Sequence, residues 1–329
     1  MTEVQTVVGD VSYMTLENDF LKAHILSYGA SIFHLFVKRN DEWIEVSVQP
    51  NDINEFLTSE FYYGKSVGRA AGRLFYPGYT IDQIEYLFGE EEKPALLHGG
   101  PNGFSFKHFD VVSFDAHHVT LKATSYEDEG PFDGELTLYA TYRLDNKAFH
   151  ITYEADTTAP TICNITNHVY LNVSTQSTID HQIIKIDAKK YLNIDETNNI
   201  ISVDDIKAPF NFNEGKYFKD ALNDMSSTPF KGYDHTFIFN PSKRPHMEVT
   251  SDIMTMKLYT TNPAVVLYTH NKPSPHVLRT LKPNQNRHAA FTIETQYEPG
   301  GIQFEGLNDA ILRPDETYKE ITTLVFETK

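Results

Sequence analysis

The chain has 329 residues, of which 40% are hydrophobic and 13% aromatic, so it can bury a substantial core. Its formal net charge of −17 argues against nucleic acid or an anionic membrane as the main partner. The one cysteine, Cys163, excludes an intramolecular disulfide framework and a cysteine-rich metal site.

We expect neither a secretory signal at the start of the sequence nor a membrane-spanning segment. Met1–Asp10 has no basic region followed by an apolar run, as a secretory signal would. The longest purely apolar stretches, such as Ala264–Tyr268, are far too short to span a bilayer. We therefore expect a soluble, cytoplasmic protein.

Short alternating or β-rich runs predict strands along the whole chain. They are Ser31–Lys38, Phe109–Phe114, His118–Ala123, Glu135–Leu144, Phe149–Ala155, Ile183–Asp187, Thr236–Asn240, Met256–Thr260, Ala264–Thr269, Phe291–Gln296 and Glu320–Glu327. Helical periodicity is confined to Asn51–Leu57 and Tyr217–Asp224. No linker, composition break or repeat divides the sequence. We predict a single all-β domain over residues 1–329, built as a sandwich or a barrel.

The run from Ile162 to Val173 predicts one strand with two chemically different faces. One face is mostly apolar, and the other carries Asn164, Thr166, His168, Tyr170 and Asn172. A polar face can simply be solvated, but this one carries no fixed charge. Amides, a phenol, a hydroxyl and an imidazole are the groups expected of a site that binds a neutral polyol.

Glu294 lies in a second such strand, Phe291–Gln296. Alternation places Glu294 with Thr292 and Gln296 on one face, and the apolar residues on the other. Most glutamates on strands are solvated, which is the ordinary interpretation. The flanking Ala289–Ala290 and Phe291 instead favour a central, buried strand.

Three loops carry further candidates, each of which is also explained as an ordinary turn. Leu96–Gly103 holds His98 among three glycines and a proline, so its backbone can approach a ligand closely. Gly68–Leu74 carries two arginines, Arg69 and Arg73, either of which could bind two hydroxyls with its planar guanidinium. In the third, Gly232-Tyr-Asp-His235, Asp234 and His235 open an apolar strand.

Other classes of site are not indicated. The 14 histidines include no H-x-x-x-H or H-E-x-x-H spacing, so we predict no metal site. The chain also lacks the G-x-S-x-G turn of serine hydrolases and the G-x-G-x-x-G loop of dinucleotide-binding proteins.

Taken together, these segments resemble the aldose 1-epimerase (galactose mutarotase) family. The matching pieces are Gly68-Arg-Ala-Ala-Gly-Arg73, Leu97-His-Gly-Gly-Pro-Asn-Gly-Phe104, Asn164-Ile-Thr-Asn-His-Val-Tyr-Leu-Asn172, Gly232-Tyr-Asp-His235, Glu294-Thr-Gln296 and Ile311-Leu-Arg-Pro-Asp-Glu-Thr-Tyr318. They follow the family's order over roughly residues 10 to 328.

The resemblance implies a β-supersandwich, no cofactor, and interconversion of the α and β anomers of a free sugar of the galactose or glucose type. It implies Glu294 as the catalytic base and His168 as the catalytic acid. It also implies that Arg73, His98 and Asp234 contact the sugar. On this hypothesis Glu294 is ionised and His168 protonated, with an acidic neighbour holding the proton.

The chain departs from the family's pattern at three places. Gly72 stands where many relatives have Asn, Tyr297-Glu-Pro-Gly-Gly301 replaces a Phe-Pro-Asp type segment, and His270 stands where Gly is frequent. Three alternatives remain: a non-catalytic carbohydrate-binding protein, a hexose-6-phosphate 1-epimerase with a local basic cluster, and a glycoside hydrolase with two carboxylates.

Overall fold

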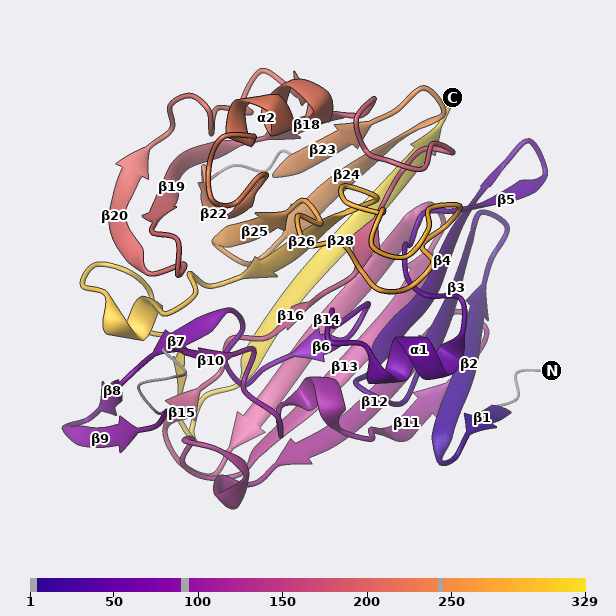
Figure 1. The fold of residues 1–329 in the computed structure, drawn as a ribbon. Helices are drawn as coiled ribbons and strands as arrows, with labels where there is room; N and C mark the ends of the chain where they lie inside the picture. The colour runs from indigo at the N-terminus through magenta and orange to yellow at the C-terminus, as the bar shows by residue number, and fades with distance from the viewer. Residues whose placement is uncertain (1–4, 90–94, 242–244) are drawn as a thin grey trace.

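The computed structural model describes residues 5–89, 95–241 and 245–329 and consists mainly of β-strands (Figure 1). The predicted all-β class is confirmed. Of the segment Met1–Asp10, residues 1–4 lie outside the described residues. Within the described ranges, no helix is long and apolar enough to cross a membrane.

The largest sheet has nine strands, and the long strands β13, β14 and β28 lie side by side in its middle (Figure 1). In spatial order its strands are β11 (Asp110–Phe114), β12 (His118–Ser125), β13 (Leu136–Asp145), β14 (Ala148–Thr157), β28 (Tyr318–Thr328), β24 (Met254–Thr260), β23 (Met247–Thr250), β18 (Ile183–Ile186) and β21 (Lys216–Tyr217). Burial alternates along β13 and β14, so one face of this sheet is apolar.

Two smaller sheets lie against that apolar face. The five-stranded sheet contains β1 (Gln5–Val8), β2 (Val11–Glu17), β3 (Leu21–Leu26), β4 (Ser31–Arg39) and β5 (Glu42–Glu45). The six-stranded sheet has the order β17 (Tyr170–Leu171), β26 (Phe291–Gln296), β25 (Ala264–Tyr268), β22 (Asp234–Phe239), β19 (Ala188–Ile194) and β20 (Ile200–Asp205). One apolar cluster joins all three sheets, with Leu138 from β13, Ile25 from β3 and Ile293 from β26 among its members.

Short ladders and helices connect these sheets. The ladders pair β7 (Arg73–Phe75) with β10 (Ala95–Leu97), β8 (Gly78–Ile81) with β9 (Ile84–Leu87), β6 (Ser66–Val67) with β16 (Thr166–Asn167), and β15 (Thr161–Ile162) with β27 (Ile311–Leu312). The helices are α1 (Ile53–Thr58), α2 (Phe218–Met225) and the 3₁₀ turns η1 (Phe104–Phe106), η2 (Glu127–Glu129) and η3 (Gly301–Gln303). Both predicted helices are confirmed to within two residues. Asp52 caps α1 by accepting hydrogen bonds from the N–H groups of Asn54 and Glu55.

The predicted single strand from Ile162 to Val173 is wrong. Residues 161–174 instead pass between sheets and change partners, pairing with β27, then β6, then β26. All of them are buried, and the amides of Asn164 and Asn172 bind backbone groups of Tyr297 and Ala289. Two of the five polar residues, Asn164 and Asn172, therefore satisfy the polar backbone of neighbouring segments, because buried amide and carbonyl groups require partners.

Candidate active site

A cavity of about 670 Å³ opens on the face of the six-stranded sheet that is turned away from the core. All five residues implied by the resemblance line this cavity: Arg73, His98, His168, Asp234 and Glu294. Antiparallel register sets the positions of Glu294 and Asp234 on that sheet, since Val266 on β25 faces both Glu294 on β26 and Thr236 on β22, two residues after Asp234. The cavity thus brings together predicted residues that are up to 221 positions apart in the sequence, from Arg73 to Glu294.

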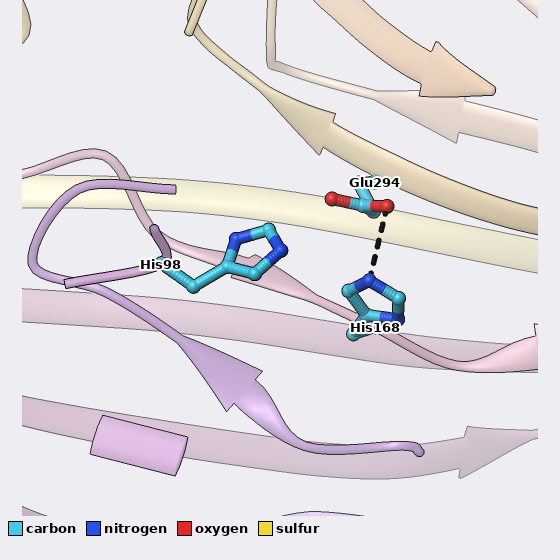
Figure 2. Close-up of side chains that lie close together, drawn as sticks. All are labelled: His98, His168 and Glu294. Atoms are coloured by element: carbon cyan, nitrogen blue, oxygen red, sulfur yellow. Dashed lines mark ion pairs between the residues drawn. The ribbon is translucent and has the colours of Figure 1, made fainter. Parts of the chain in front are cut away.

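Glu294 and His168 lie together in a buried part of the cavity. The predicted central strand is confirmed, because β26 lies between β17 and β25 and is buried along its whole length. Glu294 is 3% exposed and His168 is 6% exposed. Figure 2 shows the imidazole of His168 directed at the carboxylate, with Nε2 3.4 Å from Oε1. Thr292 donates a hydrogen bond of 3.0 Å to the same Oε1.

Burial opposes a charge on either group. It raises the pKa of the Glu294 carboxyl to about 8, with a further contribution from the nearby Asp234 carboxylate. It lowers the pKa of His168 to about 4, although Asp234 acts in the opposite direction. Burial therefore favours the neutral pair, a carboxylic acid beside an imidazole, in the free site, and the charged pair that the predicted roles require holds the same single proton in the other position. The acidic side chain beside His168 is Glu294, and it is itself buried. Burial favours the neutral carboxylic acid form of Glu294, so this side chain does not hold a second proton on the histidine.

His98 is the third buried group and its ring points toward the other two (Figure 2). The N–H of Gly72 donates to His98 Nδ1 over 3.1 Å, and the N–H of His98 donates to the Gly72 carbonyl over 2.8 Å. Because Nδ1 accepts, the proton of the neutral ring is on Nε2. Burial, followed by the nearby His168 and Arg73, holds the pKa of His98 well below its ordinary value. A neutral His98 is thus a hydrogen-bond donor toward the cavity.

Arg73 and Asp234 lie nearer the mouth. Their side chains are 30% and 27% exposed, and Nη1 of the arginine lies 3.9 Å from Oδ2 of the aspartate. Asn198, in the turn between β19 and β20, donates a hydrogen bond of 2.9 Å to that same Oδ2. Sequence analysis did not identify Asn198, because no local pattern indicates that this turn reaches Asp234.

Arg69 and His235, the other candidates from these loops, support the fold and do not line the cavity. Arg69 is 1% exposed and donates to the backbone carbonyls of Ser125, Asp133 and Gly134. It therefore neither binds a sugar nor lies on the surface. His235 points away from the cavity and packs against Phe210 and Phe230.

His98, His168 and Glu294 have nitrogen and oxygen atoms within 4.8 Å of one another. Two imidazoles and one carboxylate are a donor set that zinc accepts in catalytic sites. The sequence-based expectation of no metal overlooked this set, because its members come from three separate segments. Treatment with a chelator would test whether these three side chains hold a metal.

Residues 12–324 match the family model described as aldose 1-epimerase. The chain belongs to the aldose 1-epimerase family. Galactose mutarotase from Homo sapiens is 29% identical over 97% of this chain and 94% of its own length. Galactose 1-epimerase from Lactobacillus acidophilus superposes with a TM-score of 0.84 at 25% identity, covering 100% of this chain and 98% of that structure. An aldose epimerase homologue from C. elegans gives a TM-score of 0.89 at 21% identity, covering 97% and 99%.

Two of the departures from the aldose 1-epimerase pattern contact each other. Gly72 has a φ of +77°, and a Cβ placed there would lie 2.4 Å from Cβ of Pro299. Pro299 therefore occupies the space that a side chain at position 72 would need. Gly72 and Pro299 are thus matched in shape at the cavity wall.

The third departure, His270, lies behind the cavity. Its ring packs edge-on against Tyr170 with centroids 5.5 Å apart, and Nδ1 binds the Asn286 carbonyl at 2.9 Å. His270 is fully buried, so it supports the cavity wall and does not contact a substrate.

Proposed function

We propose that this protein interconverts the α and β anomers of a free aldose, with Glu294 as the base and His168 as the acid. The observation that carries the proposal is the buried carboxylate 3.4 Å from a buried imidazole, at the closed end of a cavity with polar groups nearer its mouth. Membership of the aldose 1-epimerase family supports it, and this family consists of isomerases.

Ring opening needs one proton removed and one supplied. The Glu294 carboxylate takes the proton of the C1 hydroxyl while the His168 imidazolium protonates the ring oxygen, and the C1–O5 bond breaks. Rotation about C1–C2 presents the other face of the aldehyde, and closure reverses both transfers. Each positioned group of this kind typically contributes about 10²- to 10⁴-fold.

The remaining residues hold the sugar. His98 donates from Nε2 toward the ring oxygen or a neighbouring hydroxyl. Arg73 donates to hydroxyls and Asp234 accepts from them, and Asn198 holds the aspartate in place. Such contacts fix the anomeric centre between Glu294 and His168, which supplies the part of the rate that proton transfer does not.

Polarimetry of freshly dissolved α-D-galactose and α-D-glucose tests the proposal. Accelerated mutarotation that is abolished in Glu294→Gln is the expected result. Binding of the sugar without any acceleration by folded wild-type protein would instead identify a non-catalytic carbohydrate-binding protein.

A hexose 6-phosphate is a second candidate substrate, because three cations besides Arg73 line the same cavity. Lys231, Lys272 and Arg287 are exposed, and none forms an ion pair with an acidic side chain of the described residues. Phosphate esters are bound by such groups through charge-assisted hydrogen bonds. Faster, salt-sensitive turnover of glucose 6-phosphate relative to glucose would favour this candidate.

We also propose that the protein acts in the cytoplasm on a small sugar, without a nucleic acid or membrane partner. The net charge of −17 supports this, since polyanionic surfaces repel an acidic protein. Retention of the sugar activity in a membrane-free cytosolic fraction is the expected result.

A further inference from the structure

We propose that Thr292 is a positioning residue for the base: its hydroxyl holds Oε1 of Glu294 and leaves Oε2 as the oxygen that exchanges a proton with the anomeric hydroxyl. This role rests on the proposed function, because Glu294 is the base of that reaction. It adds a residue from outside the cavity lining and gives the two carboxylate oxygens different tasks.

Thr292 lies beside the base on the same strand. It precedes Glu294 by two residues on β26, so the two side chains point to the same face of the sheet. The register pairs Thr292 with Tyr170 on β17 and with Tyr268 on β25. Thr292 is fully buried, and it is not among the described residues that line the cavity. Its hydroxyl is therefore closed to a sugar, so its effect on the reaction passes through Glu294.

The two oxygens of the Glu294 carboxylate have different surroundings. Oε1 accepts the hydrogen bond of 3.0 Å from the Thr292 hydroxyl and lies 3.4 Å from Nε2 of His168. No hydrogen bond from the described residues reaches Oε2, and in Figure 2 this oxygen lies on the side of His98. A substrate hydroxyl at Oε1 would compete with Thr292, whereas at Oε2 it would displace no protein donor. Oε2 is thus the oxygen available to the C1 hydroxyl.

The Thr292 hydroxyl is held in the orientation that serves the carboxylate. Threonine branches at Cβ, which restricts its χ1, and Glu294 is the hydrogen-bond partner of this hydroxyl among the described residues. A buried hydroxyl without a partner is unfavourable, so the contact fixes both side chains. A carboxylate held in one orientation favours proton transfer to and from a hydroxyl at a fixed place.

The same hydrogen bond favours the ionised carboxylate, which is the form that acts as the base. Burial and the nearby Asp234 carboxylate raise the pKa of Glu294, whereas the Thr292 hydroxyl and Arg73 lower it. Because the hydroxyl is uncharged, it stabilises the carboxylate without adding a buried charge. Thr292 thus opposes the effect of burial at the oxygen that it contacts.

The other titratable and charged groups around the carboxylate come from neighbouring strands and loops. They are His98, His168, Arg73, Asp234, Tyr170 and Tyr268. Burial raises the pKa of both tyrosines and lowers that of both histidines, so all four are mainly neutral near pH 7. A substitution at Thr292 leaves this set unchanged, so its effect on the rate reports the lost hydroxyl.

Removal of the hydroxyl should change the pH dependence of the rate in a way that a packing defect would not. The active arrangement, an ionised Glu294 with a protonated His168, is the minor form of a pair that holds one proton near neutral pH. A higher pKa of Glu294 makes this form rarer, so kcat/KM falls between about pH 4 and pH 8. Well above pH 8 the carboxylate is ionised with or without the hydroxyl, so the two rates should converge.

The experiment measures kcat/KM for α-D-glucose by polarimetry from pH 4 to pH 10, with spontaneous mutarotation subtracted. For the loss of one hydrogen bond to a charged group, Thr292→Val should lower kcat/KM about tenfold near pH 7 and move the alkaline limb up by about one pH unit. Its rate should equal that of wild type near pH 10. Thr292→Ala should behave in the same way, and Thr292→Ser, which keeps the hydroxyl, should restore the wild-type profile.

Thr295→Val is the matched control, because Thr295 is a buried threonine on the opposite face of the same strand. Infrared spectroscopy adds a measurement that needs no turnover. The band of the protonated carboxyl group that Glu294→Gln lacks should titrate about one pH unit higher in Thr292→Val than in wild type.

The outcomes separate the role of Thr292 from the proposed function. A loss of kcat/KM that is equal at every pH, an unshifted alkaline limb, or a Thr292→Ser variant no faster than Thr292→Val would overturn the role of Thr292 and leave the proposed function intact. If wild type accelerates neither galactose nor glucose, the proposed function is overturned, and the infrared titration still decides whether Thr292 stabilises the ionised Glu294.

Discussion

Replacing Glu294 by Gln should abolish mutarotation and stabilise the fold, because the carboxyl group is both the proposed base and a buried acid. Its pKa is raised by burial from 4.5 to about 8. Below pH 4.5 the folded and unfolded chains both hold the proton. Between pH 4.5 and 8 only the unfolded chain releases it, which favours unfolding by about 1.4 kcal/mol per pH unit. Wild-type stability therefore falls by roughly 3 kcal/mol between pH 5 and pH 7 from this group alone.

The side chain of the Glu294→Gln variant would not titrate, and its amide oxygen can still accept the hydrogen bond from Thr292. Urea unfolding of wild type and variant at pH 5 and pH 7 measures the effect, with polarimetry on the same samples. The stability advantage of the variant should grow between the two pH values, and Glu305→Gln, an exposed position, controls for the loss of one charge. An equal advantage at both pH values would show that folded Glu294 is not protonated near neutral pH. Wild-type turnover by the variant would refute its role as the base.

The site leads to four further predictions. Because Glu294 and His168 must share one proton, a plot of kcat/KM against pH should be bell-shaped, falling below about pH 4 and above about pH 8. The rate of spontaneous mutarotation is subtracted at each pH. A kcat/KM that keeps rising above pH 9 would contradict this prediction. Asp234→Asn should raise KM about tenfold and change kcat less, and a loss mainly in kcat would count against anchoring. Arg69→Met should lower the free energy of unfolding by at least about 3 kcal/mol, because the substitution leaves three backbone carbonyls without their donor. A decrease below about 1 kcal/mol would refute the structural role of Arg69. Dialysis against a chelator should leave the rate unchanged, and recovery of a lost rate on adding zinc would show that His98, His168 and Glu294 hold a metal.

Some features of the site follow from local alternation in the sequence. The alternation of side chains along β26 predicts which face of the strand carries Glu294. The apolar residues that precede Glu294 predict that the strand is buried. The two helices follow from short periodic runs. The strands β2 and β3 were not predicted, although both alternate. In β3 the alternation is weak, because its inward positions include Ala and its outward ones are Lys and His.

Long-range contacts are what the sequence could not predict. The run from Ile162 to Val173 alternates like a strand, yet each part pairs with a different segment of the chain. The contact between Asn198 and Asp234 joins the turn between β19 and β20 to a residue 36 positions later in the chain. The protonation preference of Glu294 depends on the number of groups that exclude water around it, which no local pattern encodes. The single-domain organisation stays a prediction.

The pKa of Glu294 is about 8 and that of His168 about 4, the reverse of the ordinary order for a carboxyl and an imidazole. This order fits the proposed reaction, as the position of the proton shared by the two groups shows. Ring opening removes a proton from O1 to Glu294 and delivers one from His168 to O5, so the pair keeps one proton and only its position changes. The charged arrangement, carboxylate with imidazolium, precedes opening, and the neutral arrangement, carboxylic acid with imidazole, accompanies the open-chain sugar. Burial favours the neutral arrangement. The pocket thus lowers the free energy of the open-chain complex relative to both ring forms, and it does so equally for the two anomers, as a catalyst working in both directions requires.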